Sequence, residues 1–205
     1  MQSLEIQDFL SQSGNGVILD VRSPKEFAHG HIPGAVSFPL FTDQERHLVG
    51  TAYKQEGREK AIVLGLEIVG PKLAEFVKSA SQYSGKTIYM HCWRGGMRSN
   101  SMAILLETVG HKVVLLKKGY KAYRNFVLAQ FTSAYKLASI AGYTGAAKTE
   151  ILHVLKSMGQ QIVDIEDLAK HKGSVFGNLD RETQPTSEQF ENNLAKELLK
   201  LDPKK

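Results

Sequence analysis

Short runs of aliphatic and β-branched residues alternate with longer helical stretches through much of this chain. VILD (17–20), KTIYMHC (86–92) and KVVLLKK (112–118) are each followed by a turn and then by a segment with helical periodicity. Such alternation is typical of an α/β fold, in which a mostly parallel sheet carries helices on both faces. Sites in such sheets lie at the carboxyl ends of the strands. The single cysteine of the chain, Cys92, ends one of these strands.

Local signals place the helices between these strands. Ser23 with Pro24 and Glu26 has the pattern of a capping box with proline at the first helical position, and it predicts a helix start. Pro71 is expected to interrupt a helical stretch, and Gly110 to close another. The helices are expected at about 43–57, 60–79, 98–110 and 119–131.

From about Tyr135 the alternating pattern restarts. YKLASIA (135–141) and QIVDI (161–165) have the character of strands on either side of the helix EILHVLKSMG (150–159), and a last helix begins at Thr186. Two strands are too few for a parallel sheet that is buried on both faces. We therefore predict two domains, 1–131 and 132–205. The second is an incomplete α/β unit, for which a C-terminal partner chain or a second copy is the expected complement.

The composition excludes several classes of protein. Hydrophobic residues make up 42% and charged residues 23%, and no stretch of 18 apolar residues suggests a membrane span. The N-terminus has no basic segment ahead of its apolar residues, so it does not resemble a signal peptide and a cytoplasmic location is expected. No metal is expected, because no His/Cys cluster has zinc spacing.

Positive charge is concentrated in the middle of the chain, although the formal net charge is only +5. Between Phe76 and Thr149 the only acidic residue is Glu107, against eleven Lys and Arg residues. This stretch is either a solvated, lysine-rich surface or a surface for a phosphate-bearing macromolecule.

The sequence around Cys92 predicts an ionised thiol. A strand that passes through a short glycine-rich turn into a helix directs backbone N–H groups and the positive end of a helix dipole at one point. Arg94 and Arg98 add positive charge, so a lowered pKa and an activated nucleophile are expected. Gly95 and Gly96 permit the tight turn. The alternative is a buried, inert cysteine.

Two anion chemistries fit this loop. In the first, the thiolate takes sulfur or selenium from a donor and carries it as a persulfide or perselenide. In the second, HCWRGGMR is the His-Cys-x5-Arg motif of cysteine-dependent phosphatases, with Arg98 gripping phosphate as a bidentate fork. The spacing alone does not separate them.

Longer phrases carry a family resemblance. LDVRSPKEFAHGHIPGA, followed by Cys92 at the end of a later strand, resembles the rhodanese family of sulfur-transfer domains. Seven phrases occur in the order found in tRNA 2-selenouridine synthases, in which a rhodanese domain is fused to a P-loop domain: GHIPGAVSFPLFTDQERHLVGTAYKQEG, GLEIVGPK, HCWRGGMRS, GYKAYR, GYTGAAKTEIL, DIEDLAKHKGSVFG and QPTSEQFENNL. The resemblance implies a rhodanese-like sheet followed by a P-loop domain that is shortened at its C-terminal end.

The resemblance also implies an activity. In this family the loop cysteine carries selenium from selenophosphate, which replaces the sulfur of 2-thiouridine at the tRNA wobble position after geranyl diphosphate has alkylated that sulfur. Cys92 would form the perselenide, and no tightly bound cofactor is expected. A selenophosphate-supplying enzyme is an expected partner. Four loop residues would hold the anionic donor: Arg94, Gly95, Gly96 and Arg98. Trp93, next to the thiol, either stacks on a base or packs at the domain surface.

GYTGAAKT matches the P-loop pattern Gly-x4-Gly-Lys-Thr through Gly142, Lys148 and Thr149, with Gly145 inside the loop. Ala147 stands where the pattern has glycine. If the backbone there needs a positive φ, alanine costs about 1 kcal/mol, which makes nucleotide binding doubtful and leaves an isoprenoid diphosphate as a ligand. Three further residues match family phrases, although the first is equally expected as a helix cap: Asp164, His171 and Ser174.

The basic middle of the chain is the expected tRNA surface, because tRNA offers phosphates and unstacked anticodon bases. Its predicted residues are Lys117, Lys118, Lys121 and Arg124, interleaved with Tyr120 and Tyr123 as stacking partners. A domain-joining helix is the alternative for this segment. For the whole chain, the alternatives are a stand-alone rhodanese sulfurtransferase or cysteine phosphatase, and a non-catalytic tRNA-binding module.

Overall fold

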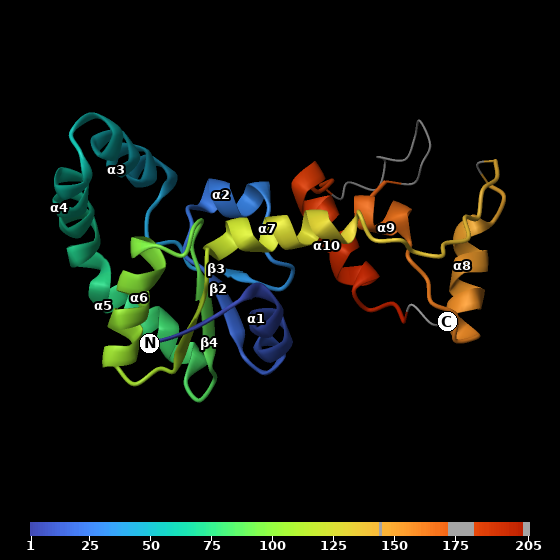
Figure 1. The fold of residues 1–205 in the computed structure, drawn as a ribbon, viewed down its shortest axis with the longest axis horizontal. Coiled ribbons are helices and arrows are strands. Elements are labelled where there is room, and N and C mark those ends of the chain that lie inside the picture. Colours follow the sequence, from blue (N-terminus) through green and yellow to red (C-terminus); the bar gives the residue numbers. More distant parts are fainter. Residues whose placement is uncertain (144, 172–182, 203–205) are drawn as a thin grey trace. The chain divides into compact units, whose positions relative to one another are not determined.

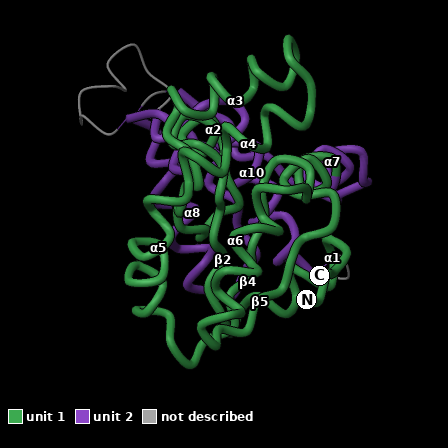
Figure 2. The backbone as a smooth tube through the Cα atoms, turned by 90° about the vertical axis from the view of Figure 1, so that its left-hand side faces the viewer, with its two compact units in different colours: residues 1–125 green, residues 126–205 purple. Residues whose placement is uncertain are grey.

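The computed structural model describes residues 1–143, 145–171 and 183–202 (Figure 1). The chain divides into two compact units, residues 1–125 and 126–205 (Figure 2). The domain boundary predicted from the sequence, after residue 131, is six residues later than this division. The difference lies in helix α7 (Gly119–Gln130), which contributes residues to both units.

Unit 1 is built on a parallel sheet of five strands in the order β1-β5-β4-β2-β3. The strands are β1 (Gln2–Leu4), β2 (Val17–Asp20), β3 (Val36–Ser37), β4 (Ile88–His91) and β5 (Val113–Leu116). The central strand β4 and its neighbour β5 are buried along their whole length, as their continuous apolar runs indicate. The predicted α/β class is confirmed, although the short edge strands β1 and β3 were not predicted.

Helices cover both faces of this sheet. α6 packs on β4 and β5, whereas α1 contacts β5, and Figure 1 shows α5 and α6 on one side of the strands with α1 on the other. The remaining polypeptide of unit 1 includes a pair of contacting helices, α3 and α4. The helices are α1 (Ile6–Gln12), α2 (Pro24–His29), α3 (Asp43–Gln55), α4 (Arg58–Val69), α5 (Leu73–Ala80) and α6 (Met97–Thr108), with short 3-10 turns at Ser13–Asn15, Gly70–Lys72 and Ser81–Tyr83.

The predicted helix signals are present. Ser23 accepts a hydrogen bond from the Glu26 backbone N–H while the Glu26 carboxylate accepts one from Ser23, so the capping box of α2 is formed. Thr42 and Glu45 form a second capping box at the start of α3. Pro71 lies in the 3-10 turn that separates α4 from α5, so the predicted interruption is confirmed.

Unit 2 contains α8 (Lys148–Ser157), α9 (Ile165–Ala169) and α10 (Ser187–Leu198). α10 begins at Thr186, whose side chain accepts a hydrogen bond from the Gln189 N–H as the sequence predicts. The strands predicted at 135–141 and 161–165 are wrong, because neither is formed and the described residues of this unit contain no strand. Two isolated parallel segments have no neighbouring strands to complete a sheet. None of the described helices combines the length and apolar character needed to cross a bilayer.

Candidate active site

The Cys92 loop connects β4 to α6 by a tight turn at the carboxyl end of the sheet. Gly95 has φ 64°, and a Cβ atom there would lie 2.9 Å from the Lys118 nitrogen. Gly119 has φ 59°, and a Cβ atom there would collide with the Cys92 carbonyl oxygen. Glycine is therefore required on both sides of the contact between this loop and the start of α7.

The start of α7 also fixes the loop by main-chain hydrogen bonds. The Tyr120 N–H donates to the Cys92 carbonyl at 2.8 Å, and the Lys121 N–H donates to the Trp93 carbonyl at 3.0 Å. These N–H groups belong to the first turn of α7, where no intrahelical acceptor is available to them. The carbonyl groups of the Cys92 loop thus accept hydrogen bonds from N–H groups of α7 that have no partner within the helix, and the same hydrogen bonds hold the loop in position.

The Cys92 thiol is buried, with 3% of the residue exposed. Its Sγ accepts hydrogen bonds from the Gly96 N–H and the Ser99 hydroxyl, each at 3.3 Å. Burial raises the pKa of this thiol, but the Ser99 hydroxyl, the Gly96 N–H and the charge of Arg98 together lower it below its ordinary value. The environment therefore favours the thiolate form of Cys92, although the sulfur is buried and not exposed to solvent.

Ser99 is a site residue that the sequence analysis missed. It lies in the first turns of α6 and is buried, with its hydroxyl also 3.1 Å from the Gly96 carbonyl oxygen. The signal was available, because Ser99 is in the first turn of the helix that follows the loop, and side chains in a helix tilt toward its N-terminus.

The guanidinium of Arg98 pairs with a carboxylate. Its Nη1 lies 2.7 Å from Glu26 Oε2, and Arg46 Nε lies 3.8 Å from the same oxygen. Burial raises the pKa of Glu26, but Arg98 and Arg46 hold it below its ordinary value. The fork that a phosphatase would direct at phosphate is therefore occupied by Glu26, while Arg94 is exposed to solvent.

A buried ion pair lies under the loop, at the ends of β2 and β4. Arg22 and Asp20 are 1% and 0% exposed, with Arg22 Nη2 2.6 Å from Asp20 Oδ2 and also donating to the Gly30 carbonyl. The guanidinium carbon of Arg22 lies 3.7 Å from the centroid of the Tyr120 ring, a cation–π contact. The sequence analysis did not assign these residues, although charges that follow an apolar strand directly are a signal of a site edge.

His91, the residue before Cys92, is fully buried beside this pair. Its Nδ1 lies 3.8 Å from Asp20 Oδ1, and its ring stacks on Tyr120 with centroids 6.0 Å apart. Burial lowers the pKa of His91 more than the Asp20 carboxylate raises it, so the ring is neutral near pH 7.

The aromatic side chains predicted to stack on tRNA bases divide into two groups. Trp93 is half-buried, tilts against Tyr120 at 5.7 Å between centroids, and lines a cleft. Tyr120 and Tyr123 are 0% and 3% exposed, so the prediction that they stack on bases is wrong. Their rings serve packing under the Cys92 loop instead.

The basic residues of the same segment differ in exposure. Lys118 and Lys121 are exposed, and Arg124 is half-buried. Lys117 lies 3.3 Å from the Glu5 carboxylate. Of the residues predicted to contact tRNA in this segment, Lys117, Lys118 and Lys121 are the ones that the structure leaves exposed.

The P-loop motif precedes α8. The Lys148 ammonium donates to the carbonyl oxygens of Gly142 and Tyr143 at 3.1 and 3.2 Å, so the lysine folds back onto the loop. Gly145 has φ 82°, and Ala147 has φ 53°, in the left-handed region that favours glycine. The strain anticipated for alanine is therefore present. Thr149 follows in the first turn of α8.

The three further family-matched residues have separate positions. Asp164 caps α9, its Oδ1 accepting a hydrogen bond from the Asp167 N–H at 3.0 Å. The His171 N–H donates to the Glu166 carbonyl just after that helix. Ser174 lies outside the described residues. Within the described residues, no group of three or more His, Cys, Asp or Glu side chains is arranged to hold a metal ion.

Comparison with known families assigns both parts of the chain. Residues 5–126 match the rhodanese-like domain, and residues 135–205 match the tRNA 2-selenouridine synthase AAA domain. The chain therefore belongs to the rhodanese-like family, and its second part is similar to the AAA domain of tRNA 2-selenouridine synthases. The predicted family, and the order of its two domains, are confirmed.

Individual relatives agree with this assignment. The chain is 42% identical over 194 residues to the tRNA 2-selenouridine synthase of Bdellovibrio bacteriovorus and 41% identical over 193 residues to that of Nitrosomonas europaea, matching 91% and 90% of this chain. It spans about half the length of these synthases, 50% and 49%. A solved structure, the N-terminal domain of a candidate ATP/GTP binding protein from Clostridium difficile 630, is 39% identical with a TM-score of 0.59, over 62% of this chain and 99% of that one.

Proposed function

We propose that this chain acts as a chalcogen transferase of the tRNA 2-selenouridine synthase type, with Cys92 carrying selenium or sulfur as a perselenide or persulfide. One observation carries the proposal: Cys92 Sγ accepts hydrogen bonds from the Gly96 N–H and Ser99 Oγ, and its pKa is lowered despite burial. The names of the relatives supply the acceptor, a tRNA in which 2-selenouridine is made, and the family resemblance implies that 2-thiouridine is its precursor.

The chain's own groups perform the loading step. The Cys92 thiolate attacks the outer chalcogen of the donor, a bond forms between Sγ and that atom, and the rest of the donor leaves with the bonding electron pair. With thiosulfate the leaving group is sulfite. With selenophosphate the P–Se bond breaks toward phosphorus, so phosphite is the co-product. The Gly96 N–H then stabilises negative charge on the carried chalcogen.

The remaining parts of the reaction extend this proposal. Geranyl diphosphate would alkylate the thiouridine sulfur with loss of diphosphate, which makes that sulfur a better leaving group. The perselenide selenium would then attack C2 of the base, and the geranyl thiolate would leave. An external thiol would attack Cys92 Sγ, break the Se–S bond so that its electron pair stays on the selenium of the base, and leave a mixed disulfide on Cys92, which a second external thiol would reduce, because the chain has no other cysteine. Lys148 and the P-loop amides would bind the diphosphate group of geranyl diphosphate. They need only phosphate oxygens, so the ligand need not be a nucleotide. A selenophosphate-supplying enzyme is a proposed partner, and a partner chain or a second copy is the proposed complement of unit 2. A cytoplasmic location is also part of the proposal, because tRNA is the proposed substrate.

Two observations favour transfer over the phosphatase alternative. The Arg98 fork that would grip phosphate is paired with Glu26 at 2.7 Å. His91, which precedes the cysteine, is buried and neutral, so it adds no positive charge to an oxyanion. A stand-alone rhodanese activity shares the loading step and differs only in its acceptor.

Mass analysis of Cys92 after separate incubation with selenophosphate, thiosulfate and an aryl phosphate tests the proposal. We expect a gain of one selenium or one sulfur with the first two donors, no phosphate release from the third, and no gain in Cys92→Ser. Steady release of phosphate from the aryl phosphate would favour the phosphatase. Phosphate rather than phosphite from selenophosphate, without a mass gain on Cys92, would show that selenium does not reside on this sulfur.

A further inference from the structure

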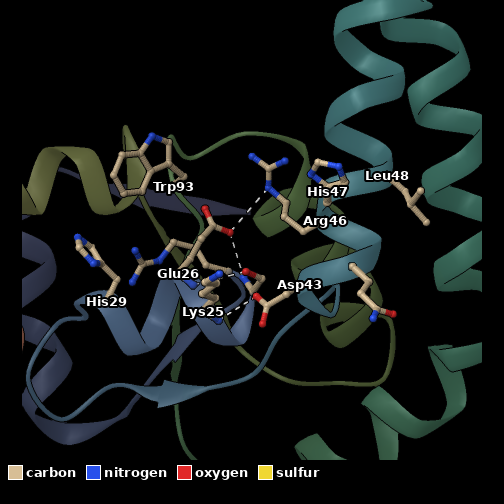
Figure 3. Close-up of a pocket in the computed structure, with 11 residues that line it drawn as sticks. Lys25, Glu26, His29, Asp43, Arg46, His47, Leu48 and Trp93 are labelled. Atoms are coloured by element: carbon tan, nitrogen blue, oxygen red, sulfur yellow. Dashed lines mark hydrogen bonds and ion pairs between the residues drawn. The ribbon is translucent and has the colours of Figure 1, made fainter.

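A cleft of about 980 Å³ lies beside the Cys92 loop, entirely within unit 1. Its walls come from α2, from the start of α3 and from Trp93, which follows Cys92 directly. Figure 3 shows the indole of Trp93 and the guanidinium of Arg46 on either side of the Glu26 carboxylate. Since Glu26 also holds Arg98 of the loop, the cleft and the candidate active site share a residue.

The lining of the cleft indicates the class of its ligand. Of the eleven lining residues, only Trp93 and Leu48 are apolar, and the rest are charged or polar, including Lys25, Arg46 and His47. The cations among these residues suit an anionic group of the ligand. A flat aromatic surface next to cations suits a ligand that combines a planar ring with phosphate, as a nucleotide does.

Arg46 provides a second, independent observation. Its Nε atom is buried and has no hydrogen-bond partner. The nearest carboxylate oxygen, on Glu26, is 3.8 Å away, which is beyond hydrogen-bond distance. The Arg46 side chain as a whole is 40% exposed, so its guanidinium is open to a phosphate oxygen, which would accept a charge-assisted hydrogen bond from it.

We propose that this cleft binds one nucleotide of an RNA substrate, with the base against Trp93 and the phosphate at Arg46. The inference rests on the proposed function, which supplies the RNA. It adds the position of the nucleotide: next to the Cys92 loop, on a surface other than the basic segment at the start of α7. Trp93 and Arg46 act as binding residues, and Glu26 positions both arginines.

Trp93 is the only tryptophan in the chain, so its fluorescence reports on the cleft directly. The experiment titrates the full chain with a single-stranded RNA oligonucleotide that contains 2-thiouridine, and in parallel with geranyl diphosphate. We expect saturable quenching by the RNA and none by geranyl diphosphate. Trp93→Leu, measured by the anisotropy of labelled RNA, should bind about tenfold more weakly, because stacking on an aromatic side chain is lost.

Arg46→Gln tests the phosphate contact. We expect about tenfold weaker binding and a salt dependence that is shallower by about 0.7 in the slope of log K against log salt, the value for one phosphate of a single strand. Arg58→Gln is the matched control, since it makes the same change at the exposed start of α4 and does not line the cleft. It should bind like the unchanged chain.

Three results would overturn the inference: RNA binding without a change in Trp93 fluorescence, saturable quenching by geranyl diphosphate, or equal effects of Arg46→Gln and Arg58→Gln. Loading of Cys92 from thiosulfate needs no RNA, so it separates the two proposals. A cleft that does not bind RNA leaves that loading intact, whereas failure of the proposed function abolishes it.

Discussion

Replacing Ser99 by alanine should raise the pKa of the Cys92 thiol by about one unit. The Ser99 hydroxyl donates to Sγ at 3.3 Å, and a hydrogen bond to a charged group contributes about 1.5–3 kcal/mol. One pKa unit corresponds to about 1.4 kcal/mol. The hydroxyl also lies 3.1 Å from the Gly96 carbonyl oxygen, so its single hydrogen is shared and the effect falls at the lower end.

Because Cys92 is the only cysteine, both thiolate absorbance and the rate of alkylation by iodoacetamide report on it alone. Below the pKa, a rise of one unit leaves about tenfold less thiolate, and the greater nucleophilicity of the more basic sulfur offsets part of this, so the rate should fall about three- to fourfold. Ser101→Ala is the control, because Ser101 is exposed on the same helix and donates to the Arg98 carbonyl. An unchanged pKa in Ser99→Ala, or equal shifts in both variants, would refute the reasoning.

Three further predictions concern the surroundings of the loop and the P-loop. Asp20→Asn should lower the free energy of unfolding in urea by about 3–5 kcal/mol, because it leaves Arg22 as an unpaired buried charge. Glu5→Gln, which breaks an exposed pair with Lys117, should cost under about 1 kcal/mol. Similar costs for the two variants would contradict the burial argument. The folded-state pKa of His91 is lowered from 6.5, so the unfolded chain binds a proton at this ring more readily than the folded chain does. The free energy of unfolding should therefore fall as the pH drops through about 6.5. A urea midpoint that stays constant from pH 7.5 to about 5.5 would show that His91 is not buried as a neutral ring. Ala147→Gly should relieve about 1 kcal/mol of left-handed strain and strengthen the binding of geranyl diphosphate, measured calorimetrically; weaker binding would exclude strain at this position as the limiting factor.

The parts of the fold that could be predicted are those with local causes. The apolar runs of β2, β4 and β5, the capping box at Ser23 and the break at Pro71 are each set by a few neighbouring residues, and the position of Cys92 at a strand end follows from them. The strands expected in unit 2 needed neighbouring strands to pair with, and the described residues of that unit contain none. The partner of Arg98 could not be predicted either, because Glu26 is 72 positions away.

The misplacement of the tyrosines has a different origin. Tyr120, Tyr123 and Val127 follow each other at the spacing of one helix face, and all three are buried. This spacing predicts a core stripe, with Lys118 and Lys121 on the exposed surface. The expectation of exposed tyrosines follows from the basic composition of the segment. The spacing of its apolar residues predicts buried tyrosines instead, and the structure agrees with the spacing.

The central claim is that the fold ionises Cys92, and titration of this one thiol in the native and the urea-unfolded chain tests it most directly. The account predicts a native pKa below the ordinary value of 9.0, to which the unfolded chain should return. A native pKa equal to or above that of the unfolded chain would mean that burial outweighs the Ser99 hydroxyl, the Gly96 N–H and Arg98. In that case Cys92 would not be the activated nucleophile on which the proposed function depends.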